Sequence, residues 1–194
     1  MNFLEKIAQY ILNEQTSSAL PSIAMQGLEE GYETPSLIML AGCNDNENPF
    51  LINQYFQGLL HELSLNSLDK KQAALFLVNS TVDKIVSNQI DVYEGCDFIF
   101  KQILDLTDLR SENKKFVYDS IELADVYSLY VTIWELMHAS VNWDKIKTNN
   151  NLMEETKQEI KKRLLEWKMY IPHDAYPSIP GDVYPPVPDE AFPL

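Results

Sequence analysis

The sequence FVYDSIELADVYSLYVTIWELMH, residues 116–138, is the stretch that decides the fold. Its apolar residues recur at intervals of three and four, which predicts one long α-helix. They also surround nearly the whole circumference of that helix, so we expect it to be the central helix of the protein. These residues are Phe116, Val117, Ile121, Ala124, Leu129, Tyr130, Ile133, Trp134 and Met137.

The same helical spacing recurs along most of the chain, whereas no long stretch alternates with the period of a β-strand. We therefore predict an all-α protein, a single bundle of seven or eight helices over residues 1–170. Helices are expected at about 2–15, 21–30, 35–41, 49–63, 69–89, 91–104, 116–138 and 152–169, with a loop over WDKIKTNNN, residues 143–151.

Capping residues mark several of these helix ends. Thr34 followed by Pro35, and Asn48 followed by Pro49, each place a capping side chain before a proline in the first turn. Asp91 stands three residues before Glu94, the spacing of a capping box. The helix that starts at Pro49 is expected to turn one apolar face inward: Phe50, Tyr55, Phe56, Leu59, Leu60 and Leu63.

From residue 171 onward the sequence departs from this pattern. AYPSIPGDVYPPVPDEAFP, residues 175–193, is an eight-residue repeat in which an aromatic residue precedes a proline. Prolines fix φ and remove backbone donors, so we expect an extended, proline-rich tail over 171–194. Tyr176, Tyr184 and Phe192 stand eight residues apart and are candidate anchors. We expect the tail to dock on the body of the protein or on a second copy, with a separate partner as the alternative.

Charge and cysteine content limit the partners and the compartment. The formal net charge of −14 repels phosphate backbones and anionic lipids, which disfavours nucleic-acid and membrane partners, and it attracts a basic protein. The first fifteen residues carry Glu5 and Lys6 within their apolar run, so they fit neither a signal peptide nor a membrane span. Cys43 and Cys96 are then expected to be free thiols in a cytoplasmic protein.

Residues suited to metal or cofactor binding are scattered. His61, His138 and His173 lie far apart, so we expect no metal site. Glu135 and His138 have the Glu-x-x-His spacing of di-iron bundles, but such sites need a second copy, which the sequence lacks. No glycine-rich phosphate loop is present, and no cofactor is expected.

Four carboxylates remain as candidates for catalysis. Asp119, Glu122 and Asp125 recur every three residues, and Glu135 follows on the same predicted helix. General acid–base chemistry needs two carboxylates whose environments separate their pKa values, which a cleft between helices can provide. The simpler interpretation is a solvated acidic stripe.

Two further segments carry a resemblance. GLEEGYETPSLIMLAG, residues 27–42, and IVSNQIDVYEGCDFIF, residues 85–100, resemble segments of small uncharacterised all-helical bacterial proteins. Asn88 stands where a glycine is usual in them, and Val92 where a proline is usual. The resemblance implies a bacterial, cytoplasmic, all-helical protein and implies no activity. Gly95, in the first turn of the helix, should let a neighbouring element approach closely.

These observations favour a non-catalytic protein that binds another protein, with its acidic surface and its tail as interaction features. An immunity protein or antitoxin that inhibits a basic toxin is one form of this hypothesis. The alternatives are an enzyme whose four carboxylates line a helical cleft and a purely structural homodimer.

Overall fold

The computed structural model describes residues 1–44, 47–65, 68–110, 116–138 and 146–170. These residues form eight α-helices and contain no β-strand, which confirms the predicted all-α class and number of helices. The candidate anchors Tyr176, Tyr184 and Phe192 lie outside them. Residues 1–170, treated above as one domain, divide by their contacts into two compact units, Met1–Asp69 and residues 70–170.

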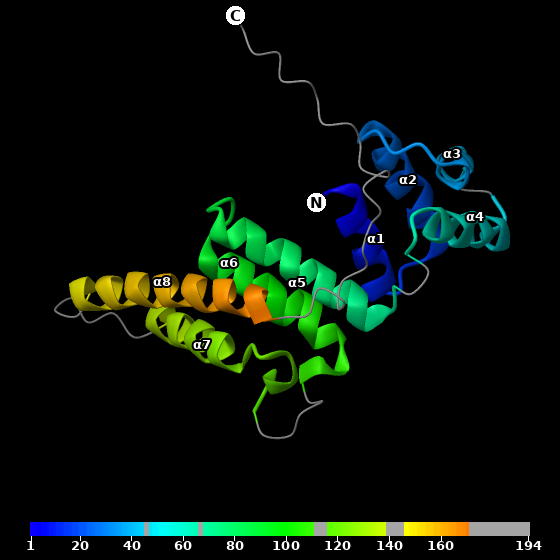
Figure 1. Ribbon diagram of the computed structural model, residues 1–194. Helices are drawn as coiled ribbons and strands as arrows, with labels where there is room; N and C mark the ends of the chain where they lie inside the picture. Colours follow the sequence, from blue (N-terminus) through cyan, green and yellow to red (C-terminus); the bar gives the residue numbers. More distant parts are fainter. Residues whose placement is uncertain (45–46, 66–67, 111–115, 139–145, 171–194) are drawn as a thin grey trace, which may run out of the picture. The chain divides into compact units, whose positions relative to one another are not determined.

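The first unit contains four helices: α1 (Phe3–Leu12), α2 (Leu20–Glu29), α3 (Pro35–Ala41) and α4 (Pro49–Glu62). Successive helices are neighbours, with α1 against α2, α2 against α3 and α3 against α4 (Figure 1). Its core consists of side chains that are almost fully buried: Phe3, Ile7, Leu12, Leu20, Leu37, Leu40 and Leu59.

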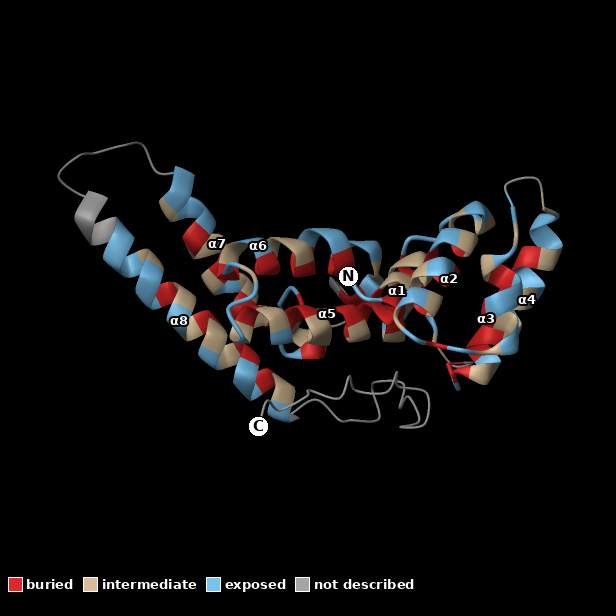
Figure 2. Cartoon of the chain, turned by 90° about the horizontal axis from the view of Figure 1, so that it is seen from above, coloured by how far each residue is buried: buried red, intermediate tan, exposed pale blue. Residues whose placement is uncertain are grey.

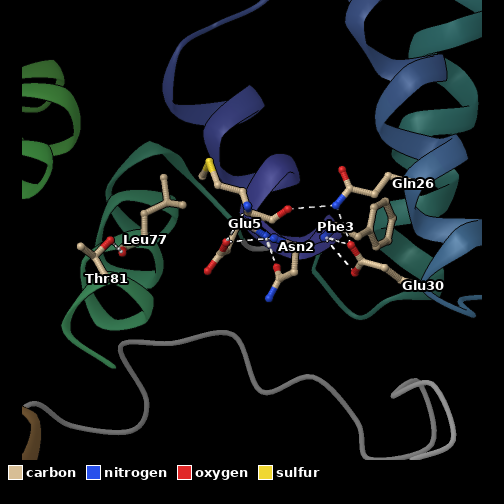
Figure 3. Close-up of polar contacts among 8 residues, drawn as sticks. Asn2, Phe3, Glu5, Gln26, Glu30, Leu77 and Thr81 are labelled. Carbon is tan, nitrogen blue, oxygen red and sulfur yellow. Dashed lines mark hydrogen bonds and ion pairs between the residues drawn. The ribbon is translucent and has the colours of Figure 1, made fainter. Parts of the chain in front are cut away.

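Local capping is largely as predicted. Thr34 accepts a hydrogen bond from the Leu37 backbone N–H, and Asn48 accepts one from Phe50. α1 adds a cap that the sequence analysis missed: Asn2 and Glu5 form a reciprocal capping box, with bonds of 2.8 and 2.9 Å (Figure 3).

The predicted inner face of α4 is wrong at its first position. Phe50 is 84% exposed, and the buried row runs through Ile52, Phe56, Leu59 and Leu60. These positions follow the three-to-four spacing of one helical face. Phe50 lies two residues before Ile52, which places it on nearly the opposite side of the helix.

The start of α3 is held by a side chain from α4. The Glu62 carboxylate accepts hydrogen bonds from the Ser36 backbone N–H at 3.0 Å and from the Ser36 hydroxyl at 2.7 Å. Gly58 makes room for this contact, since a Cβ there would lie 2.4 Å from Ser36 Oγ. Burial raises the pKa of Glu62, but hydrogen bonds from Thr34 and Ser36 outweigh burial and hold that pKa below its ordinary value.

Glu62→Gln is expected to reduce the acid sensitivity of the protein. Because the folded pKa of Glu62 is lowered, the carboxylate contributes stability that is present above the ordinary carboxyl pKa of about 4.5 and is lost as the pH falls through the folded value. Urea unfolding followed below about pH 4.5 should therefore show a weaker pH dependence in the variant than in the wild type. Glu29→Gln, at an exposed position on α2, is the control. Equal slopes for wild type and Glu62→Gln would contradict the assignment.

The second unit contains α5 (Lys70–Val86), α6 (Val92–Asp97), α7 (Ala124–His138) and α8 (Ile146–Tyr170). α6 continues into a π-helical turn, Phe98–Ile103, which is followed by short 3₁₀ turns. α8 packs against α7, α5 and α6 (Figure 1). It buries a narrow row, Thr156, Ile160, Leu164 and Trp167, and buried and exposed segments alternate along it in Figure 2.

The turn between α5 and α6 is shaped by Asn88 and Asp91. Asn88 adopts a left-handed conformation with φ of 60°, which asparagine tolerates better than most residues other than glycine. Asp91 caps α6 by accepting from Tyr93 and Glu94. The close approach expected at Gly95 is confirmed, because a Cβ there would lie 2.5 Å from Ile85 Cγ1 on α5.

Two predicted helix boundaries in this unit are wrong. α8 begins at Ile146, within the stretch predicted as a loop, although residues 149–151 are asparagines of low helix propensity. The helix predicted over 116–138 begins only at Ala124. The residues before it form a separate 3₁₀ turn, Asp119–Ile121, and this break shapes the candidate site.

Candidate interaction groove along α7

The break before α7 is fixed by contacts that are distant in the sequence. Tyr118 and Glu122 flank the 3₁₀ turn in left-handed conformations, with φ of 62° and 58°. Tyr118 is almost fully buried, and its hydroxyl donates to Asp105 Oδ1 at 3.0 Å while its ring packs 5.1 Å from that of Phe100. Left-handed backbone is unfavourable for a tyrosine, so this buried contact must stabilise it.

α7 is buried on one side only, contrary to the prediction of a central helix. Val126, Tyr130 and Ile133 face the core. On other sides of the helix, Trp134 is 44% exposed and Met137 is 52% exposed. Phe116, which precedes the helix, is 61% exposed. The apolar circumference of this stretch is therefore covered only in part within the described residues.

The buried side of α7 is fastened by a polar contact. The Tyr130 hydroxyl donates to Asp97 Oδ1 at 2.6 Å, and Lys101 forms an ion pair with the same carboxylate oxygen at 2.5 Å. Burial raises the pKa of Asp97, but the hydrogen bonds from Lys101 and Tyr130 outweigh burial and lower it. The pKa of Tyr130 is raised, first by burial and then by its bond to Asp97. This contact fixes the rotation of α7 and hence the face that it exposes.

The outer face of α7 and the segment before it border an open groove of about 710 Å³, which we call the α7 groove. Its apolar lining comes from two sides, with Phe116 and Val117 on the preceding segment and Tyr127 and Val131 on the helix. Its polar lining consists of Asp119, Asp125, Ser128, Thr132 and Glu135.

Three of the four carboxylates singled out from the sequence line this groove: Asp119, Asp125 and Glu135. Glu122 is not among the lining residues. Asp125 is paired with Arg163 of α8 at 2.6 Å, and its side chain is 74% exposed. The described residues provide no hydrogen bond or ion pair to the carboxylates of Asp119 and Glu135. The groove thus combines apolar side chains with carboxylates that can bind a cation from another molecule.

Among the histidine and cysteine residues considered for chemistry, neither His138 nor Cys96 has the surroundings of a catalytic or metal-binding residue. Among the described residues, no group of three or more His, Cys, Asp or Glu side chains is placed to hold a metal ion. His138 stacks on Trp134, and its Nδ1 lies 2.7 Å from the Trp134 carbonyl oxygen. Burial raises the pKa of the Cys96 thiol to about 12, which makes it a poor nucleophile at neutral pH.

Cys43 is a free thiol and only half-buried. Its thiol donates to the Met39 carbonyl oxygen. Its pKa is raised, first by burial and then by the charge of Glu47. A raised thiol pKa reduces the thiolate fraction at neutral pH, which is the opposite of what a catalytic cysteine needs.

A smaller hollow of about 270 Å³ lies between the α5–α6 turn and α8, and its charged side chains have hydrogen-bonding partners within the unit. Lys157 forms an ion pair with Asp91 at 2.6 Å, and Lys161 donates to the Asn88 side chain at 2.5 Å. These contacts attach α8 to the turn. The hollow therefore serves the packing of the unit.

Comparison with known protein families, with characterised proteins and with solved structures finds no match to this chain. In the part of the chain that the structure describes, no helix has both the length and the apolar character needed to cross a membrane. The fold and the lining of the groove describe an all-α protein with a groove that is both apolar and acidic.

Sequence reasoning found the acids of the groove but missed its apolar wall. Phe116 and Val117 were assigned to the inside of a central helix, whereas both are exposed. The apolar circumference of residues 116–138 was the signal that could have indicated this wall. A helix that is apolar all round needs a covering on every side, so any side left uncovered is a candidate binding surface.

Proposed function

We propose that this chain is a non-catalytic protein that acts by binding a basic protein, and that the α7 groove is the binding surface. The observation that carries this proposal is the exposure, among the residues that the structure describes, of apolar side chains on α7 and on the segment before it. Exposed apolar side chains rimmed by polar ones are typical of protein interaction sites. The carboxylates of Asp119 and Glu135 in the same groove, together with the net charge of −14, favour a basic partner.

An inhibitor of a basic toxin, like an immunity protein or an antitoxin, is one form of this function. Such an inhibitor needs an acidic surface that attracts its target quickly and a contact area that holds it. In this form, the partner bound at the α7 groove would lose its own activity on binding.

The enzyme alternative has one observation in its favour, which is that Asp119, Asp125 and Glu135 share a groove. Acid–base catalysis works best where the protein excludes water and holds the substrate among fixed dipoles. The exposure of Phe116 and of the Asp125 side chain leaves this groove open to solvent. An open, partly apolar groove suits a protein ligand better than a reaction.

Site-specific photo-crosslinking in the source cells tests the proposal. A photoreactive residue at position 116 should crosslink the full chain to one basic protein, whereas the same residue at position 50, an exposed phenylalanine of the first unit, should not. The purified partner should then bind wild type and Phe50→Ser equally, and Phe116→Ser at least tenfold more weakly.

Each of the following results would overturn the proposal, as would a failure to find any basic protein crosslinked from position 116. A crosslink from position 116 to a second copy would favour the structural homodimer. A crosslink within the same chain would show that the chain covers its own groove. Equal crosslinking of one partner from positions 116 and 50 would show that the groove is not the binding surface.

A further inference from the structure

Resting on the proposed function, we infer that the α7 groove receives an amphipathic α-helix of the partner, one that carries apolar residues on one face and lysine or arginine beside them. The first support is the form of the groove. Its helical wall extends from Ala124 to Glu135, about three turns or roughly 16 Å. Tyr127 and Val131 stand one turn apart on this wall, with Phe116 and Val117 as the other wall.

Whether the bound segment is a helix or a strand follows from how its backbone hydrogen bonds can be satisfied in the groove. A bound strand gains its affinity by adding to the edge of a sheet, and the described residues contain no strand. A segment that enters a groove between side chains must satisfy its own backbone hydrogen bonds, which a helix does internally. Helix-in-groove recognition is therefore the binding mode that fits.

The charges of the groove specify the flanks of that helix. Asp125 is paired with Arg163, whereas Asp119 and Glu135 lack such a pairing among the described residues. Basic side chains on the incoming helix can reach these two carboxylates while its apolar face meets Phe116 and Val131. Charge pairs at the rim set orientation and association rate, and apolar burial at the centre supplies most of the affinity.

The same charges disfavour two other occupants. A two-fold dimer through this surface would bring Asp119, Asp125 and Glu135 of one copy against the same acidic surface of the other. The segment 171–194 contains Asp174, Asp182, Asp189 and Glu190 and neither lysine nor arginine, so its charge also opposes binding here. A basic helix from another protein meets neither objection.

The inference can be tested with three synthetic peptides of about five helical turns. The first is an amphipathic helix of leucine and lysine, the second replaces each lysine by glutamate, and the third scrambles the first so that no apolar face forms. Each is titrated into the isotopically labelled full chain, followed by amide NMR shifts, with peptide helicity followed by circular dichroism. The first peptide should bind, become helical and shift signals within 116–135, and the other two should bind at least tenfold more weakly.

Matched variants locate the binding. Phe116→Ser and the double variant Asp119→Asn/Glu135→Gln should each weaken the first peptide severalfold or more, the former about tenfold. Phe50→Ser and the double variant Glu29→Gln/Glu33→Gln change exposed positions of the first unit, and the double variant removes the same number of charges. They should change affinity less than about twofold. The two double variants have equal net charge, so they separate a local effect from general attraction.

Equal binding of the scrambled peptide, or equal losses in both double variants, would show general electrostatic attraction and overturn the inference. Shifts that map outside residues 116–135 would overturn it as well. A different result would contradict the proposed function: crosslinking from position 116 in the source cells would find no basic protein. If crosslinking identifies such a protein while the leucine–lysine peptide does not bind, the function stands and the helical mode of recognition is wrong.

Discussion

Replacing Trp167 by alanine is expected to lower the free energy of unfolding by about 3–5 kcal/mol, as measured by urea denaturation. The Trp167 side chain is only 3% exposed, so its removal leaves a cavity under α8. Its indole N–H also donates to the Ile121 carbonyl oxygen at 2.7 Å, in a buried bond that attaches α8 to the turn before α7. The alanine variant loses both the packing and this bond.

Trp167→Phe separates these two effects. Phenylalanine keeps much of the apolar volume but leaves the buried Ile121 carbonyl without its donor, for which we expect a loss of about 1–3 kcal/mol. The exposed Trp134 is the control, and Trp134→Phe should change stability by less than about 0.5 kcal/mol. A Trp167→Phe variant as stable as the wild type would show that the hydrogen bond does not hold the turn.

The second large effect is expected at Gly95, where an added methyl group has no space. A Cβ at this position would lie 2.5 Å from Ile85 Cγ1 and 2.6 Å from Ile85 Cδ1, and Ile85 is fully buried. Gly95→Ala should therefore destabilise the protein by about 1–3 kcal/mol, even though alanine is the better helix former. Gly42→Ala is the matched control, because a Cβ there would meet nothing nearer than 3.5 Å.

A double-mutant cycle tests the physical reason. Ile85→Ala alone should cost about 2–5 kcal/mol because it opens a cavity. In that background the methyl group of Gly95→Ala gains space, so the second substitution should become neutral or stabilising. Purely additive losses would show that close contact with Ile85 is not what requires glycine.

Those parts of the fold that depend on neighbouring residues were predictable. Thr34, Asn48 and Asp91 cap helices through bonds to residues two or three positions further on, and the sequence identified all three. The contacts that break or join elements across longer distances were not predictable. Glu62 binds Ser36 across 26 positions, and Trp167 binds Ile121 across 46 positions. No local pattern specifies such pairs.

In the candidate site, too, local sequence patterns were predictable and long-range contacts were not. Asp119, Asp125 and Glu135 were chosen because they recur on one predicted helix, yet Asp119 lies in a 3₁₀ turn outside α7. The groove exists because Tyr118 is held by Asp105 and Phe100, and this contact interrupts the helix. Sequence periodicity indicated an apolar circumference but could not show which part of it stays exposed. The exposed part is the one to which we assign a function.

Side-chain footprinting of the full chain with hydroxyl radicals tests the central claim most directly. The exposed Phe116 and the half-buried Tyr127 of the α7 groove should react in the purified protein and become protected when the labelling is done in the source cells. Phe50, exposed on the first unit, should react equally in both conditions. If Phe116 and Tyr127 are already protected in the purified chain, or react equally in the cells, the α7 groove is not the surface through which this protein binds a partner.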